Sequence, residues 1–135
     1  MSENEKKKKI LIIDDEADTV TYLETLLRDN GYETISANNG KEGMAKVKSE
    51  NPDLVLLDVS MPEQSGMGFY REIRGDTKLS AIPVIFVTGV TGFGGDDQAI
   101  RKFIEGRKNI APPDGYFAKP IDRDDFIKKI NAILG

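Results

Sequence analysis

Three aspartates stand directly after short apolar runs and have the chemistry to bind a cation. Asp14 and Asp15 follow residues 10–13 (ILII), and Asp58 follows residues 54–57 (LVLL). If the three meet in the fold, two carboxylates about 4 Å apart repel by roughly 4 kcal/mol at an effective dielectric constant near 20, and the third adds to this cost. Mg²⁺ relieves it, because this hard cation takes oxygen ligands and keeps positions open for water or a phosphoryl group. The acids therefore predict a Mg²⁺ site.

A hydroxyl and an ammonium group stand in comparable positions. Thr88 follows residues 84–87 (VIFV), and Lys119 follows residues 116–118 (YFA). Together they can hold the phosphoryl oxygens that a metal leaves free. Asp58 is the best candidate nucleophile, since it ends the central apolar run, and a carboxylate that attacks phosphorus forms an acyl phosphate. The predicted chemistry is phosphoryl transfer to Asp58.

The elements that must position these residues follow from the alternation of apolar runs with amphipathic segments. Weaker apolar runs at 33–36 and 116–118 join the three runs at 10–13, 54–57 and 84–87. Continuous apolar strands indicate a sheet that is covered on both faces. Five strand–helix units in alternation predict a parallel sheet with right-handed crossovers. Ligands of such sheets bind beyond the carboxyl ends of the strands, where the candidate residues would gather.

Local signals place the ends of two helices. Gly31 can end the first helix in the left-handed region, and Asn39 can cap the second helix, which ends before Pro52. The apolar helix positions predicted to pack on the sheet are Val20, Leu23, Leu27, Met44, Val47, Met67, Tyr70, Ile73, Ile100, Phe103, Ile104, Phe126, Ile130, Ile133 and Leu134.

The composition excludes several classes of site. The 135 residues fit one domain and contain no cysteine and no histidine, so disulfides, thiolate or histidine metal sites and phosphohistidine chemistry are excluded within this chain. The net charge of −4 argues against binding of nucleic acid or of an anionic membrane surface by this domain. Residues 1–9, which include KKKK, are expected to be a mobile basic tail, and four apolar residues after them are too few for a signal peptide. We therefore expect a cytoplasmic protein.

The same segments resemble the receiver domain of two-component response regulators. ILIIDDE, PDLVLLDVSMPEQSG, PVIFVTG and YFAKP occur in this order, each on the expected element, and the resemblance covers Ile10 to Leu134. It implies an α/β fold with a doubly wound five-stranded parallel sheet, strand order 2-1-3-4-5, of flavodoxin-like architecture with helices on both faces. The receiver domain would span residues 10–135, either as a stand-alone protein or as part of a larger regulator.

The resemblance also implies a function and a set of partners. A histidine kinase or phosphotransfer protein would donate a phosphoryl group to Asp58 in the presence of Mg²⁺. The domain would then switch conformation and regulate binding to a downstream protein, with a phosphorylation-dependent dimer as a further expectation. Such a protein is a self-phosphorylating switch rather than an enzyme, with slow autodephosphorylation. Asp14 and Asp15 would hold Mg²⁺ together with Asp58 and the backbone carbonyl of Ser60.

Further roles carried over from the family concern the phosphoryl group and the switch. Thr88 and Lys119 would contact the phosphoryl oxygens, and the ring of Tyr116 would follow the state of Thr88. A cis peptide is implied between Lys119 and Pro120, since only X-Pro bonds adopt this form cheaply. The segment from 88 to 119 is longer than receivers usually need, which puts the usual partner geometry of this region in doubt.

Alternatives remain open at this point. Asp14 or Asp15 could cap the first helix, and Asp58 could begin a turn before Pro62. A Mg²⁺-dependent phosphatase or phosphotransferase with an aspartyl intermediate would want a second acid where Ser60 stands. A flavodoxin-like cofactor binder would want a phosphate-binding loop after the first strand, where acids occur. The glycine-rich residues 89–97 lack the Lys-Ser/Thr of a Walker loop and predict an ordinary loop.

Overall fold

The computed structural model describes residues 7–58, 63–88, 114–118 and 121–134, and for residues 63–67, 88, 116 and 118 it describes the backbone alone. The described elements are, in chain order, β1 (Lys9–Ile13), α1 (Ala17–Asp29), β2 (Glu33–Ala37), α2 (Gly40–Glu50), β3 (Leu54–Asp58), α3 (Glu63–Gly75), β4 (Val84–Thr88), β5 (Gly115–Ala118) and α5 (Arg123–Leu134). The helix expected around residues 100–104 and the loop expected at 89–97 lie outside the described residues.

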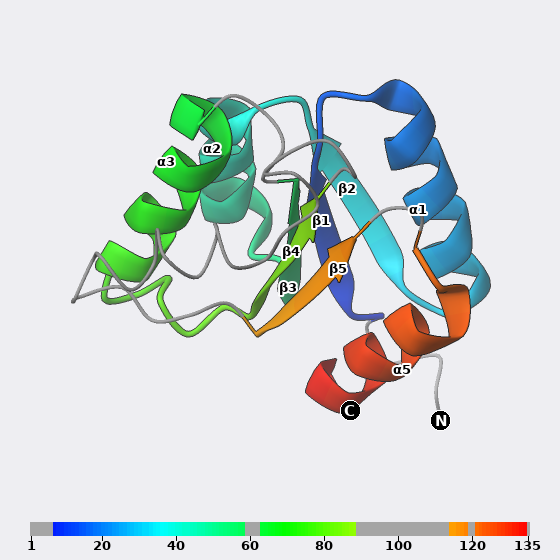
Figure 1. Ribbon diagram of the computed structural model, residues 1–135. Coiled ribbons are helices and arrows are strands. Elements are labelled where there is room, and N and C mark those ends of the chain that lie inside the picture. Colours follow the sequence, from blue (N-terminus) through cyan, green and yellow to red (C-terminus); the bar gives the residue numbers. More distant parts are fainter. Residues whose placement is uncertain (1–6, 59–62, 89–113, 119–120, 135) are drawn as a thin grey trace.

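The five strands form one parallel sheet in the order β2-β1-β3-β4-β5, as predicted. Helices α1 and α5 cover one face, and α2 and α3 cover the other (Figure 1). Alternate strand residues face opposite sides, so Leu11 and Ile13 join the core beneath α2 and α3, whereas Ile10 and Ile12 join the core beneath α1 and α5. This two-sided burial explains why the strand sequences are continuously apolar.

The tail predicted at residues 1–9 is one residue too long, because Lys9 is the first residue of β1. Its backbone N–H donates to Oδ2 of Asp53 at 2.8 Å, and its Nζ lies 3.0 Å from Oε1 of Glu50. These contacts hold the start of β1 against the turn before β3. Residues 1–6 of the predicted tail lie outside the described residues. In Figure 1 the start of β1 and the end of α5 both lie at the edge of the sheet where the strands begin.

Two predicted helix ends are confirmed by their hydrogen bonds. Gly31 has φ +90°, and the N–H groups of Gly31 and Tyr32 donate to the carbonyls of Arg28 and Leu27, which is the Schellman arrangement. At the start of α2, the side chain of Asn39 accepts from the N–H of Glu42 at 2.8 Å. Both signals are local, so the sequence alone locates them.

The glycine inside α2 has a packing role. A Cβ added at Gly43 would overlap Cδ1 of Ile13 and lie 3.0 Å from its Cγ1. Because Ile13 is fully buried at the end of β1, Gly43 allows α2 to lie close to the strand that leads into the acidic residues. A Cβ added at Gly68 in α3 would meet nothing within 4 Å.

Among the described residues, the helices are too short or too polar to cross a bilayer.

Candidate functional site

Asp14 and Asp58 emerge side by side from neighbouring strands. Ile13 of β1 is paired with Leu57 of β3, and the next residues along the two strands are Asp14 and Asp58. Both are buried, with exposures of 2% and 3%. Asp58 is the last residue of β3 and is paired with Val87 of β4, and the turn considered between Asp58 and Pro62 lies outside the described residues. The register of a parallel sheet thus places the two carboxyl groups at one edge.

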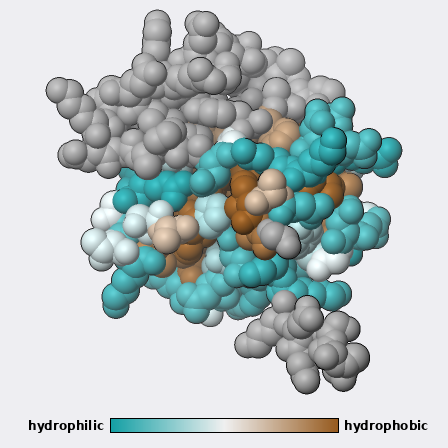
Figure 2. Space-filling view, turned by 90° about the horizontal axis from the view of Figure 1, so that it is seen from below, coloured by the Kyte–Doolittle hydropathy of each residue, from teal (hydrophilic) through white to brown (hydrophobic). Residues whose placement is uncertain are grey.

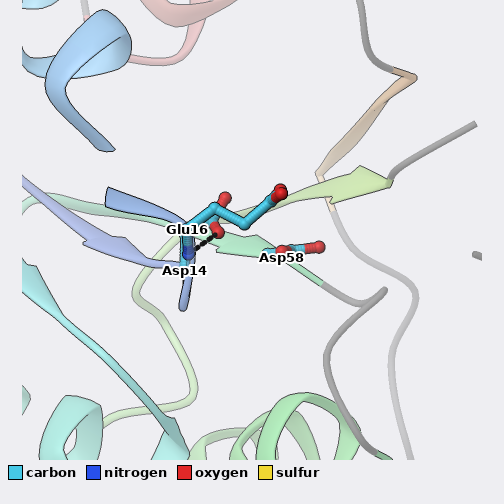
Figure 3. A group of neighbouring side chains, drawn as sticks. All are labelled: Asp14, Glu16 and Asp58. Carbon is cyan, nitrogen blue, oxygen red and sulfur yellow. Dashed lines mark hydrogen bonds between the residues drawn. The ribbon is translucent and has the colours of Figure 1, made fainter. Parts of the chain in front are cut away.

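Glu16 completes a group of three acids at this edge. Asp14, Glu16 and Asp58 each offer a carboxylate oxygen, and these oxygens all lie within 4.8 Å of one another. Figure 3 shows the Glu16 side chain extending from the turn after β1 toward Asp58. Glu16 is exposed to solvent, whereas the two aspartates form the buried floor of the group.

The turn that follows β1 is held by Asp14. Its backbone N–H donates to the carbonyl of Ala37 at 3.1 Å, which continues the ladder between β1 and β2. Its Oδ1 accepts from the N–H of Glu16 at 2.9 Å (Figure 3). An aspartate that accepts from the N–H two residues on closes an Asx turn. The turn therefore aims both Asp14 and Glu16 at the end of β3.

Helix capping does not account for the two aspartates after β1. The residue at the N-cap position of α1 is Glu16, and its side chain makes no capping hydrogen bond. Asp14 and Asp15 thus stand before α1 and do not occupy its N-cap position. Cation binding is therefore the better explanation for two adjacent aspartates at this place.

Electrostatics favour a cation at this group. Two charged carboxylates at 4.8 Å, the upper limit of the separations in this group, repel by about 3.5 kcal/mol at an effective dielectric constant near 20. Solvent screens the repulsion that involves the exposed Glu16. The repulsion between Asp14 and Asp58 is screened less, because both side chains are buried. All the donors are carboxylate oxygens, which fit a hard divalent cation rather than a soft metal. The residues present therefore fit the kind of metal that the sequence predicted.

The other predicted site residues differ in how far the structure describes them. Asp15 is exposed and stands outside the group of three. Thr88 is the last residue of β4 and is paired through its backbone with Ala118 of β5, and Tyr116 lies within β5. Their side chains lie outside what the structure describes, as do Ser60, Lys119 and Pro120. The roles expected of these residues remain predictions.

Glu16 was not singled out from the sequence. Its only signal is its place in ILIIDDE, directly after the aspartate pair. The approach of its carboxylate to Asp58 depends on the turn that Asp14 closes, and a turn closed by one side-chain hydrogen bond leaves no repeating pattern in the sequence.

Comparisons with known proteins match the observed fold. The model of the response regulator receiver domain family matches residues 10–131. PilH of Pseudomonas aeruginosa is 36% identical over 126 residues, which cover 93% of this chain and 97% of PilH. The polar-differentiation response regulator DivK of Brucella anthropi is 33% identical over 128 residues, which cover 95% of this chain and 97% of DivK.

Solved structures show the same architecture. A candidate response regulator from Chloroflexus aurantiacus is 26% identical, with a TM-score of 0.80, over 96% of this chain and 98% of that one. The chemotaxis response regulator CheY4 of Vibrio cholerae has a TM-score of 0.78 over 96% of this chain and all of that one; at 23% identity it shows the fold alone.

The chain belongs to the response regulator receiver domain family. It is a phosphoacceptor receiver domain of two-component signalling, and the predicted flavodoxin-like receiver architecture is confirmed. Receiver domains are signalling switches that interact with histidine kinases or phosphotransfer proteins and with downstream targets. Nothing in these comparisons favours the phosphatase alternative.

Proposed function

We propose that Asp58 is the residue that accepts the phosphoryl group and that Mg²⁺ binds beside it. The observation that carries this proposal is the approach of the Asp14, Glu16 and Asp58 carboxylates within 4.8 Å of one another. The group lies at the carboxyl ends of β1 and β3, and β2 and β3 flank β1 on opposite sides, so the strand order reverses at this point. Ligands of open parallel sheets bind at such a point.

Each residue has a defined part in the proposed reaction. Asp14 and Asp58 would hold Mg²⁺ together with Asp15 and, as the family resemblance implies, the backbone carbonyl of Ser60, and Glu16 would add negative charge at the solvent side. An oxygen of Asp58 forms a bond to phosphorus while the bond from phosphorus to the donor nitrogen or oxygen breaks, and the donor leaves with that electron pair. Mg²⁺ held by these residues would supply positive charge that offsets the charge of the phosphoryl oxygens. Thr88 and Lys119 hold the oxygens that the metal does not.

Conformational switching follows from contacts that exist only after phosphorylation. The new dianionic group gives the Thr88 hydroxyl and the Lys119 ammonium a charged acceptor. A change from 1:99 to 99:1 between two conformations takes about 5.5 kcal/mol, which a few charge-assisted hydrogen bonds can supply. Tyr116 reports the state of Thr88, and the switched surface regulates a downstream protein or a phosphorylation-dependent dimer.

The phosphorylated form is proposed to be long-lived. By the family resemblance, Ser60 and Val90 would take the two positions that affect the lifetime of the phosphoryl group in relatives, and neither side chain carries an acid or an amide to position a hydrolytic water. Autodephosphorylation is therefore slow. Replacing Ser60 with asparagine is expected to speed loss of the phosphoryl group, measured by intact mass over time.

The phosphoacceptor is tested with acetyl phosphate and Mg²⁺. We expect one hydroxylamine-labile phosphoryl adduct by intact mass spectrometry, and no adduct on the Asp58→Asn variant. Asp29→Asn is the matched control, because Asp29 is exposed at the end of α1. An adduct of equal yield on Asp58→Asn would overturn the assignment.

Metal binding is tested separately by titration calorimetry with MgCl₂. Asp14→Asn and Asp15→Ala are each expected to abolish measurable binding, since each removes a proposed ligand. Glu16→Gln is expected to weaken binding by less, because water screens the Glu16 charge. Unchanged Mg²⁺ affinity in both aspartate variants would refute the proposed ligand set.

A further inference from the structure

A buried arginine connects three segments at the edge of the sheet opposite the acidic group. Arg74 lies in the last turn of α3, and its side chain is 7% exposed. Its Nη1 donates to the carbonyls of Ser80 and Ile82, at 2.8 and 2.9 Å, in the segment that leads into β4. Its Nη2 donates to Oδ2 of Asp114, at 3.0 Å, directly before β5. Figure 2 views the molecule from this edge, where hydrophobic residues show between hydrophilic ones.

The guanidinium group is fixed in place by an aromatic contact as well. Its central carbon lies 5.2 Å from the ring centroid of Tyr70, and its Nε donates to the Tyr70 hydroxyl at 3.1 Å. Tyr70 in turn packs edge-on against Phe86 of β4, with ring centroids 4.8 Å apart. Contacts within α3 and with the segment before β4 thus hold Arg74 in place independently of Asp114.

Asp114 binds both this arginine and the first residue of β4. Its Oδ2 accepts from the N–H of Val84 at 2.9 Å, and its own N–H donates to the carbonyl of Val84 at 2.8 Å. The ladder continues directly from this pair, with Ile85 beside Gly115 and Thr88 beside Ala118. Asp114 therefore lies beside Val84, one residue before the first pair of the ladder between β4 and β5.

A short edge strand needs such an anchor. β5 has four residues and stands at the end of the strand order, with β4 as its neighbour. Few ladder hydrogen bonds hold it, and a slip by one residue would turn every side chain of the strand to the other face. The contacts of Asp114 to Val84 and Arg74 select one register.

We propose that Asp114, held by Arg74, is a positioning residue that sets the register of β5 and thereby places Lys119 for phosphoryl transfer to Asp58. Lys119 follows Ala118, the last residue of β5, so its place along the sheet depends on that register. The part that concerns Lys119 rests on the proposed function, whereas the part that concerns the register does not.

The register is tested by amide hydrogen exchange in Asp114→Ala, Asp114→Asn and Asp124→Ala. Asp124 is an exposed aspartate in the first turn of α5, so its variant controls for loss of one negative charge. In Asp114→Ala we expect amides of Gly115–Ala118 to exchange about 10-fold faster, a change of about 1.4 kcal/mol in local opening. Amides of Leu54–Asp58 are expected to keep their rates, which separates local loosening of β5 from a loss of global stability.

The asparagine variant provides a conservative rescue. Its amide oxygen can still accept from the N–H of Val84, so protection of β5 is expected to be largely retained. Equal exchange of β5 amides in Asp114→Ala and Asp124→Ala would overturn the proposed anchor. Equal acceleration in β3 and β5 would also overturn it, because it would show a general loss of stability.

The functional part is tested by the rate of phosphorylation with acetyl phosphate. In Asp114→Ala we expect a rate about 10-fold lower at saturating donor, since small misplacements of catalytic groups are costly. The half-saturating Mg²⁺ concentration is expected to stay the same, because Asp14 directly follows β1 and Asp58 ends β3, and neither belongs to β5. A normal rate together with faster β5 exchange would refute the link to Lys119. If the unaltered protein takes up no phosphoryl group, the proposed function fails, and the exchange experiment still decides the register.

Discussion

Replacement of Gly43 by alanine is expected to destabilise the protein, although alanine favours helices. A methyl group at this position would overlap Cδ1 of Ile13 and lie 3.0 Å from its Cγ1. Ile13 is completely buried, so it can move only by displacing its neighbours in the core. Overpacking of this kind costs about 1–3 kcal/mol. Higher helix propensity returns up to about 1 kcal/mol, so the middle of this range leaves a net loss of about 1 kcal/mol.

Gly68→Ala is the matched control for this prediction. The same substitution in the interior of α3 meets nothing within 4 Å, so only the gain in helix propensity remains. We expect this variant to be more stable than the unaltered protein by about 0.5–1 kcal/mol. The two variants should therefore differ by about 2 kcal/mol, with opposite signs.

Urea unfolding followed by circular dichroism measures both variants. With a slope of about 1.5 kcal/mol per molar urea, a difference of about 2 kcal/mol separates the two midpoints by more than about 1 M. Because Ile13 precedes Asp14, Gly43→Ala is also expected to weaken Mg²⁺ binding, whereas Gly68→Ala leaves it unchanged. The packing argument is refuted if Gly43→Ala is as stable as the unaltered protein, or if both variants lose stability equally.

Three other predictions concern the switch, a helix cap and a buried phenol. Thr88→Ala is expected to take up the phosphoryl group measurably but to lose the conformational response, so phosphorylation would no longer change the amide NMR shifts; unchanged switching would refute this role. Asn39→Ala removes the acceptor of the Glu42 N–H and should cost about 1 kcal/mol of unfolding free energy in urea; a loss below the error of the measurement would contradict the cap. Burial raises the pKa of Tyr32 above its ordinary value, so folding favours the neutral phenol. The stability that comes from this preference is fully present below about pH 10 and is lost as the pH rises through the raised pKa. Tyr32→Phe should lower stability at neutral pH, because the hydrogen bond to Asn131 is lost, and should reduce the alkaline decrease; an unchanged alkaline slope would contradict this.

Predictions that depend on strand pattern and on local hydrogen bonds succeeded. The apolar run before Asp14 occupies β1, and the run before Asp58 occupies β3, each within one residue of the observed strand. Gly31 and Asn39 act within four residues of their own positions, so their effects are visible without knowledge of the fold. The approach of Asp14 to Asp58 joins distant parts of the sequence, but it follows from parallel pairing of the strands that carry them.

The contacts that escaped prediction depend on tertiary geometry. Glu16 reaches Asp58 only because Asp14 closes a particular turn after β1. Arg74 and Asp114 are 40 residues apart and lie in no recognisable pattern, so nothing in the sequence couples them. The packing of Gly43 against Ile13 becomes visible only once α2 lies on β1.

The chain enters β1 and leaves α5 at the edge of the sheet where the strands begin (Figure 1). The start of β1 and the end of α5 are therefore attachment points for affinity tags, fluorophores or surface linkers at the edge opposite the carboxylates of Asp14 and Asp58. An immobilised protein should present its phosphoryl acceptor to a kinase in solution with equal access from either attachment point.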